Sequence, residues 1–135
     1  MNDTHPAIIA QQDAALPARI VEATRDYRRE ALALRTREAY ADAWKQFDGW
    51  CATMGRRSMP ASPETVSAWA TALADGHDGR RPRATKTIQL YVTAVIYMHR
   101  TAGHQLSTKD AEIRTALAGI ARTKAKTQMP ARRRR

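Results

Sequence analysis

The residues best suited to chemistry form a basic segment in the second half of the chain. Between Arg80 and His104 the sequence has no acidic residue and five basic ones: Arg80, Arg81, Arg83, Lys86 and Arg100. Guanidinium and ammonium groups pair with phosphate oxygens, and each such contact adds affinity that falls with salt concentration. This spacing indicates a surface that binds a polyanion, and an ordinary solvated loop is the alternative interpretation.

Lys86 and Thr87 add a second feature, because they fall in the first turn of a helix predicted over residues 84–102. The first amides of a helix lack partners within it and lie at the positive end of its dipole, so they attract anions. Both side chains lie off the apolar stripe of this helix. The pattern therefore predicts that phosphate groups contact the chain at this point.

The overall charge agrees with a nucleic acid as the partner. The chain of 135 residues has 23 Lys and Arg against 13 Asp and Glu, which gives a net charge of +10. No stretch approaches the ~18 consecutive apolar residues of a membrane span, and the basic segments lack a separate lipid-facing stripe. We expect double-stranded DNA as the partner, with no membrane and no small-molecule substrate.

Candidates for catalysis or metal binding are sparse. The single cysteine, Cys51, excludes an intrachain disulfide and a cysteine metal cluster. His99 falls on an apolar face, which predicts a hydrogen-bonded core histidine, and the other histidines are scattered. The first residues lack the basic start and apolar core of a signal peptide. We expect no metal, no cofactor, no enzymatic activity and a cytoplasmic location.

The apolar pattern predicts an all-α protein. Helices are expected over residues 18–34, 36–54, 63–75, 84–102 and from about 107 to 122, with no strand. Thr36 is the expected N-cap of the second helix, Ser62 caps the third, and Ser107 to Asp110 resemble a capping box for the fifth. Tyr27, Tyr40 and Tyr91 fall on the apolar stripes, where packing is the expected role. The domain prediction is a flexible arm at 1–17, a compact bundle of about five helices at 18–122 and a basic tail at 123–135.

Two stretches resemble a known family when taken in order. Thr36-Arg37-Glu38-Ala39-Tyr40 leads to Phe47-Asp48-Gly49-Trp50-Cys51, and Ala84-Thr85-Lys86-Thr87-Ile88-Gln89 leads to Met98-His99-Arg100. Together with the Pro63-Glu64 helix start they resemble the N-terminal core-binding domain of tyrosine recombinases, the phage-integrase family, which is a SAM-like helical domain. The resemblance covers roughly residues 25–125.

This resemblance implies a DNA-binding role. In the family the domain clamps one side of the DNA with its second and fourth helices in consecutive major grooves, while a separate domain cuts and rejoins the strands. The matching positions here are Thr36, Arg37, Lys45, Lys86, Thr87 and Gln89. Leu90 departs from the family pattern, which has a polar residue there, although a leucine can contact a thymine methyl group. For Arg37 and Lys45 an ordinary role on the helix surface is an equal alternative.

The resemblance also bears on the ends of the chain and on assembly. Arg132 and Arg133 match the start of a linker that crosses DNA, with a basic tail of general affinity for polyanions as the alternative. In the family the fifth helix contacts the next protomer, which implies a homo-oligomer on DNA. His77-Asp78-Gly79-Arg80 matches the family's His-x-x-Arg pair only as a string, in a loop of the wrong domain.

Two other functions remain open on the sequence. One is a helical protein-interaction or assembly module whose basic charge is incidental. The other is a small DNA-binding regulator with a helix-turn-helix motif. Against the regulator, the loop from His77 to Arg83 is longer than the turn of 3–4 residues that this motif uses.

Overall fold

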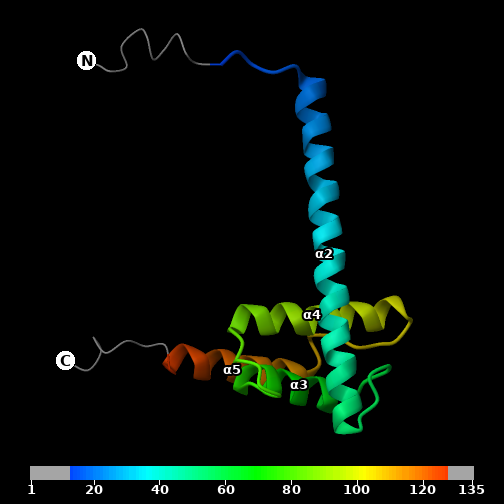
Figure 1. Cartoon of the computed structure of the whole chain (residues 1–135), viewed down its shortest axis with the longest axis vertical. Helices are drawn as coiled ribbons and strands as arrows, with labels where there is room; N and C mark the ends of the chain where they lie inside the picture. The colour runs from blue at the N-terminus through cyan, green and yellow to red at the C-terminus, as the bar shows by residue number, and fades with distance from the viewer. Residues whose placement is uncertain (1–12, 128–135) are drawn as a thin grey trace, which may run out of the picture. The chain divides into compact units, whose positions relative to one another are not determined.

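The computed structural model describes residues 13–127, and all of its regular elements are helices (Figure 1). They are α2 (Ala18–Met54), α3 (Pro63–Asp75), α4 (Thr85–Thr101) and α5 (Ala111–Thr127). Within this range the only β-type pairing is an isolated bridge between His77 and Arg80. The predicted all-α fold class is confirmed. None of the described helices combines the length and apolar character that crossing a membrane requires.

The prediction of two helices over residues 18–54 is wrong, because α2 is continuous. Residues 31–40 contain no glycine or proline, and a threonine inside a helix costs only a few tenths of a kcal/mol relative to alanine. Thr36 is therefore a residue of the helix interior and not an N-cap. The described residues contain four helices where about five were expected.

The chain divides into two compact units, one up to Thr36 and one from Arg37 onward. In the first unit the apolar stripe expected to be buried is exposed: the exposed fraction is 39% for Ile20, 76% for Tyr27 and 50% for Leu34. The predicted core role of Tyr27 is therefore wrong. The limits 18–122 proposed for the domain stay a prediction, and most of the arm at 1–17 lies outside the described residues.

The hydrophobic core belongs to the second unit. α3 packs against both α4 and α5 (Figure 1). The end of α2 adds the rings of Phe47 and Trp50 to this core. Phe47 lies against Trp69 of α3 with ring centroids 4.9 Å apart. The largest fully buried side chains are Phe47, Trp69, Leu73, Ile88, His99 and Ile113. Tyr40 and Tyr91 are half-buried, and the exposed Met54 does not belong to the core.

The ends of the helices follow local signals with one exception. Ser62 caps α3 as predicted, since its Oγ accepts from the Thr65 amide at 3.1 Å, and Gly76 ends α3 with a φ of 88°. The cap of α5 is Asp110 and not Ser107: Asp110 Oδ1 accepts from the Glu112 amide at 2.9 Å. An aspartate at this position satisfies free amides of the first turn directly, so the helix begins later than predicted.

Candidate nucleic-acid interface

The start of α4 is the part of the second unit best arranged for an anion. Its N-cap, Ala84, offers no side-chain hydrogen bond, and the first turn contains no acidic residue. By contrast, α3 and α5 are capped by Ser62 and Asp110. The first amides of α4 therefore keep their capacity to donate, and an anion there would also gain from the helix dipole.

Four of the predicted contact residues belong to α4. Lys86, Gln89 and Leu90 are exposed and Thr87 is half-buried. Lys86 and Leu90 are four residues apart and so lie above one another on the helix surface. The exposed fraction of Leu90 is 45%, so this position presents an apolar contact beside the polar ones.

The loop before α4 is held firmly to α3. The Arg80 amide donates to the His77 carbonyl at 2.7 Å, and the Arg83 amide donates to the Leu73 carbonyl at 2.8 Å. A Cβ atom at Gly76 would lie 2.8 Å from the Arg80 carbonyl oxygen, so only glycine fits this approach. Arg80 and Arg83 therefore extend from a backbone that is hydrogen-bonded at both residues, with Arg81 between them.

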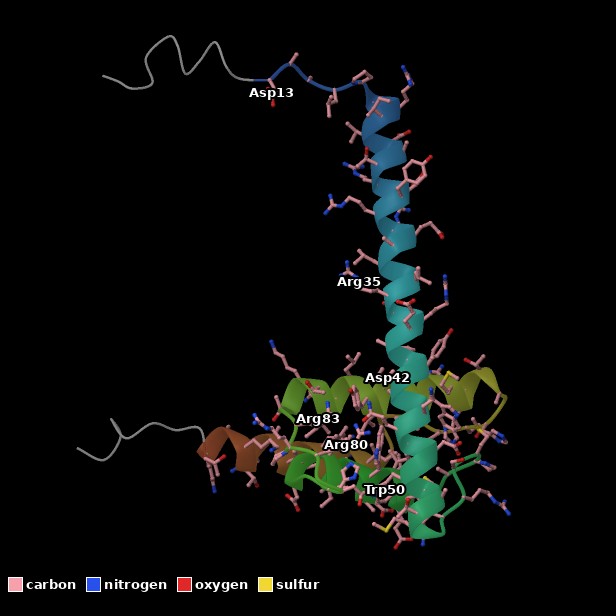
Figure 2. All side chains as sticks on the ribbon, viewed as in Figure 1. Asp13, Arg35, Asp42, Trp50, Arg80 and Arg83 are labelled. Carbon is pink, nitrogen blue, oxygen red and sulfur yellow. The ribbon has the colours of Figure 1, made fainter. Side chains whose placement is uncertain are left out.

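The three arginines differ in their surroundings, and Figure 2 labels two of them, Arg80 and Arg83. The Arg83 guanidinium lies 5.5 Å from the centre of the Tyr91 ring and donates to the Tyr91 hydroxyl at 3.4 Å. Arg80 donates to Gln46 Oε1 at 3.4 Å. Arg81 is exposed, and no side-chain hydrogen bond of Arg81 is found within residues 13–127.

Lys45 of α2 lies close to Arg80 of the basic loop. Lys45 and Arg80 line one hollow of about 310 Å³, whose other lining residues are Gln46, Gly49, Trp50, Thr53, His77 and Asp78. Two positive side chains from segments far apart in the sequence thus border one concave surface. The carboxylate of Asp78 offsets part of this charge and lies 3.3 Å from His77 Nδ1.

The remaining predicted contacts lie elsewhere. Thr36 and Arg37 are exposed inside α2, Thr36 in the first unit and Arg37 in the second. Arg132 and Arg133 lie outside the described residues. Lys124 is helical, since α5 runs to Thr127, and its Nζ donates to the Ala74 carbonyl at 2.9 Å, where it ties α5 to the end of α3.

The residue types that could bind a metal ion or act as a nucleophile lie as follows in the described part of the chain. Residues 13–127 contain no group of three or more His, Cys, Asp or Glu side chains placed to hold a metal ion. His99 is fully buried and hydrogen-bonded at both nitrogens, to the Ala61 amide at 2.9 Å and the Val95 carbonyl at 2.8 Å, as predicted for a core histidine. Burial raises the pKa of Cys51 to about 11, which leaves it a neutral thiol.

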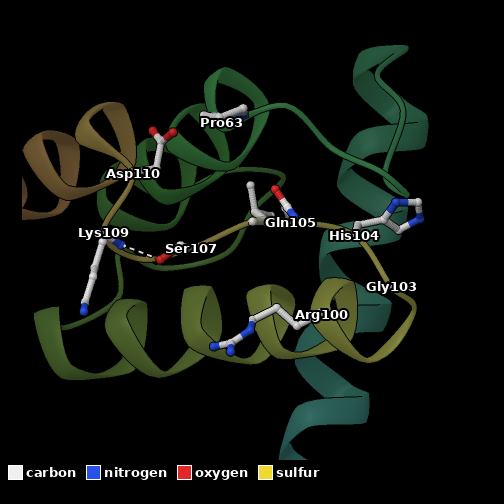
Figure 3. A pocket seen from close by; sticks show the side chains of 9 residues that line it. Pro63, Arg100, Gly103, His104, Gln105, Ser107, Lys109 and Asp110 are labelled. Atoms are coloured by element: carbon white, nitrogen blue, oxygen red, sulfur yellow. Dashed lines mark hydrogen bonds between the residues drawn. The ribbon is translucent and has the colours of Figure 1, made fainter.

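A second hollow, of about 790 Å³, lies at the C-terminal end of α4 (Figure 3). Arg100, His104, Lys109 and Asp110 are among its lining residues. Asp110 is engaged as the cap of α5, and the Lys109 amide donates to Ser107 Oγ at 3.0 Å. This hollow shares no lining residue with the one between Lys45 and Arg80.

Comparison with known proteins finds one similar protein. No family model matches the chain. It is similar to the integrase/recombinase xerD homolog of Selenomonas ruminantium, with 36% identity over 92 residues. The matched region is 66% of this chain and 25% of that protein, so the chain spans about a quarter of its relative's length. The similarity supports a relation to integrases and recombinases.

Sequence reasoning missed two residues of the interface, Gln46 and Tyr91. Gln46 carried no signal beyond its place beside Lys45, and Tyr91 was assigned to packing because it falls on the apolar stripe of its helix. Their side chains meet across 45 residues of sequence, with Gln46 Nε2 lying 3.3 Å from the Tyr91 hydroxyl. No local pattern reports such a contact.

Proposed function

We propose that this chain binds duplex DNA as the core-binding domain of a tyrosine recombinase or integrase, most like that of the Cre recombinase. The observation that carries the proposal is the uncapped, acid-free start of α4 beside the basic loop from Arg80 to Arg83. The similarity to the integrase/recombinase homolog supports recombination as the setting. The role is to position the protein on a recombination site.

In this proposal α4 and the part of α2 that carries Lys45 enter consecutive major grooves. Lys86, Thr87 and the first amides of α4 contact phosphates, which fix orientation without reading sequence. Gln89 faces a base edge, and Leu90 contacts a thymine methyl group. Thr36 and Arg37 add contacts along α2, and Arg132 and Arg133 follow the DNA backbone beyond the bundle.

We assign no strand cleavage to this chain, because in the family that chemistry belongs to a separate domain. The half-buried Leu117 and Ile120 of α5 pack only partly against the core, which supports contacts between protomers on DNA. The chain would act in the cytoplasm, where its DNA lies.

A salt titration tests the proposal. Binding of the full chain to a labelled duplex is followed by fluorescence anisotropy between ~50 and ~200 mM salt, where log affinity should fall linearly with log salt. Alanine at Arg81, Arg83 and Lys86 together should weaken binding at least tenfold. Alanine at Lys109 and Arg114, two exposed basic residues near the start of α5, is the control. Salt-independent or absent binding of the unaltered chain would overturn the proposal.

A protein-interaction module is the second candidate, and the exposed side chains of the first unit favour it. Tyr27 and Leu34 expose 76% and 50% of their surface on a helix whose charges lie on its other faces. Exposed apolar stripes of this kind often mark contacts with other proteins. An interaction module would keep its partner affinity when Arg81, Arg83 and Lys86 are alanine, and would lose it when Tyr27 and Leu34 are serine.

A further inference from the structure

The side chain of Gln46 joins three parts of the second unit. Its Nε2 lies 2.9 Å from Asp42 Oδ2 and 3.3 Å from the Tyr91 hydroxyl, and its Oε1 accepts from Arg80 at 3.4 Å. A guanidinium only donates and a carboxylate only accepts, so these partners fix the orientation of the amide. Gln46 therefore ties α2 to α4 and to the loop that precedes it.

Tyr91 is the second centre of this network. Its hydroxyl oxygen accepts from both Gln46 Nε2 and the Arg83 guanidinium, which also lies 5.5 Å from the centre of its ring. The ring stacks on Trp69 at a centroid distance of 6.1 Å and an interplanar angle of 15°. Since Trp69 is fully buried, the core fixes the Tyr91 ring and the ring in turn holds Arg83.

We propose that Gln46 and Tyr91 are positioning residues that hold Arg80 and Arg83 ready for the phosphate backbone of duplex DNA. This inference rests on the proposed function. Free arginine side chains lose rotamer freedom when they bind, and a side chain already held by neighbours loses less. Arg80 joins the network at Gln46 and Arg83 joins it at Tyr91, and Tyr91 belongs to α4, the helix whose first turn has no side-chain cap.

Substitutions that remove a polar group and keep the size of the side chain distinguish the positioning role from a role in packing. Tyr91→Phe removes only the hydroxyl and keeps the ring between Arg83 and Trp69, and Gln46→Leu removes the amide from a half-buried position. Each should weaken duplex binding about three- to tenfold and reduce the salt slope by up to roughly one. Tyr40→Phe and Gln105→Leu remove the same groups outside the network and should bind as the unaltered chain does. Circular dichroism establishes that each variant is folded.

A combined variant tests whether Tyr91 acts through the arginines. When Arg80 and Arg83 are both alanine, adding Tyr91→Phe should weaken binding no further, because coupled residues show non-additive effects. If Tyr91→Phe weakens binding as much in the double-alanine chain as it does in the unaltered chain, the inference is overturned. A folded Gln46→Leu chain that binds duplex DNA with unaltered affinity and salt slope would also overturn the inference. This test holds even if the Tyr91→Phe chain does not fold.

The same titrations distinguish two kinds of failure. If the unaltered chain binds duplex DNA and the Gln46 and Tyr91 variants bind equally well, only the positioning role falls. If the unaltered chain shows no salt-dependent binding, the proposed function is wrong, and so is this inference, which rests on it.

Discussion

The two halves of α2 share one continuous helical backbone and differ in their surroundings. In residues 18–36 no side chain is buried, whereas in residues 37–54 the exposed fraction is 0% for Phe47 and 1% for Cys51. Strong helix formers extend an existing helix one residue at a time without the cost of a new nucleus. Helix formation in the first half therefore does not require that its apolar side be covered.

The registers of the two halves also differ. Ile20, Tyr27 and Leu34 recur every seven residues, and that series continues at Ala41 and Asp48, which are exposed. The buried side chains of the second half follow another series: Ala43, Phe47, Trp50 and Cys51. An apolar stripe thus identifies an amphipathic helix, and only contacts with other elements establish a core.

The largest change in stability should come from removing an aromatic ring in the buried half of α2, and the same change in the exposed half is its control. Phe47→Ala should lower the free energy of unfolding by about 3–5 kcal/mol, because it empties a fully buried site. Tyr27→Ala, on the exposed half, should change it by less than about 0.5 kcal/mol. Urea denaturation followed by circular dichroism measures both. A comparable loss for Tyr27→Ala would mean that the first half is covered in solution.

A buried polar contact of the second unit should give the next largest effect. His99→Leu leaves the Ala61 amide without its acceptor in the core, which should cost about 1–3 kcal/mol. His104→Leu, at a half-buried neighbour, is the matched control and should cost less. Thermal unfolding compares the pair, and equal melting temperatures would contradict the assigned role of His99.

Cys51, in the buried half of α2, predicts that stability depends on pH. Burial, aided by Asp48 and opposed by Arg56, raises the pKa of this thiol from its ordinary 9.0 to about 11. Between pH 9 and 11 the unfolded chain loses a proton that the folded chain keeps, so stability is complete below pH 9 and falls as pH rises. The loss should reach at most roughly 3 kcal/mol, since each pKa unit corresponds to about 1.4 kcal/mol. Cys51→Ala should remove this component from denaturation curves measured at each pH.

The smallest changes in stability test whether α2 is continuous at Thr36, by comparing this residue with a true N-cap. Ser62→Ala should cost about 1 kcal/mol, because it removes the N-cap of α3. Thr36→Ala should be neutral or slightly stabilising, since alanine is the better residue inside a helix. A loss of similar size at both positions, measured by urea denaturation, would show that a helix begins at Thr36 after all.

The sequence predicts an element well where its signals are local. α3 is bounded by Ser62 and Pro63 at one end and Gly76 at the other, and its bounds agree with the prediction. Thr36 suits both a cap and a helix interior, so the sequence around it could not decide between one helix and two. The burial of each stripe depends on residues far along the chain, which periodicity does not report.

The candidate interface also has a part that local sequence predicts and a part that depends on long-range packing. The basic segment and the start of α4 are contiguous in sequence and were predicted from residue type alone. The link between Lys45 and Arg80, and the network of Gln46 and Tyr91, depend on the packing of α2 beside α4. The contacts themselves are therefore visible only once the helices are assembled.

The most direct test of the interface follows the backbone amides while duplex DNA is added. In ¹⁵N-resolved NMR spectra of the full chain, the account predicts the largest shifts at the amides of Arg80, Arg81 and Arg83 and of residues 85–87, and their loss at high salt. It predicts small shifts along residues 20–34. Large shifts confined to residues 20–34, with the start of α4 unchanged, would contradict it.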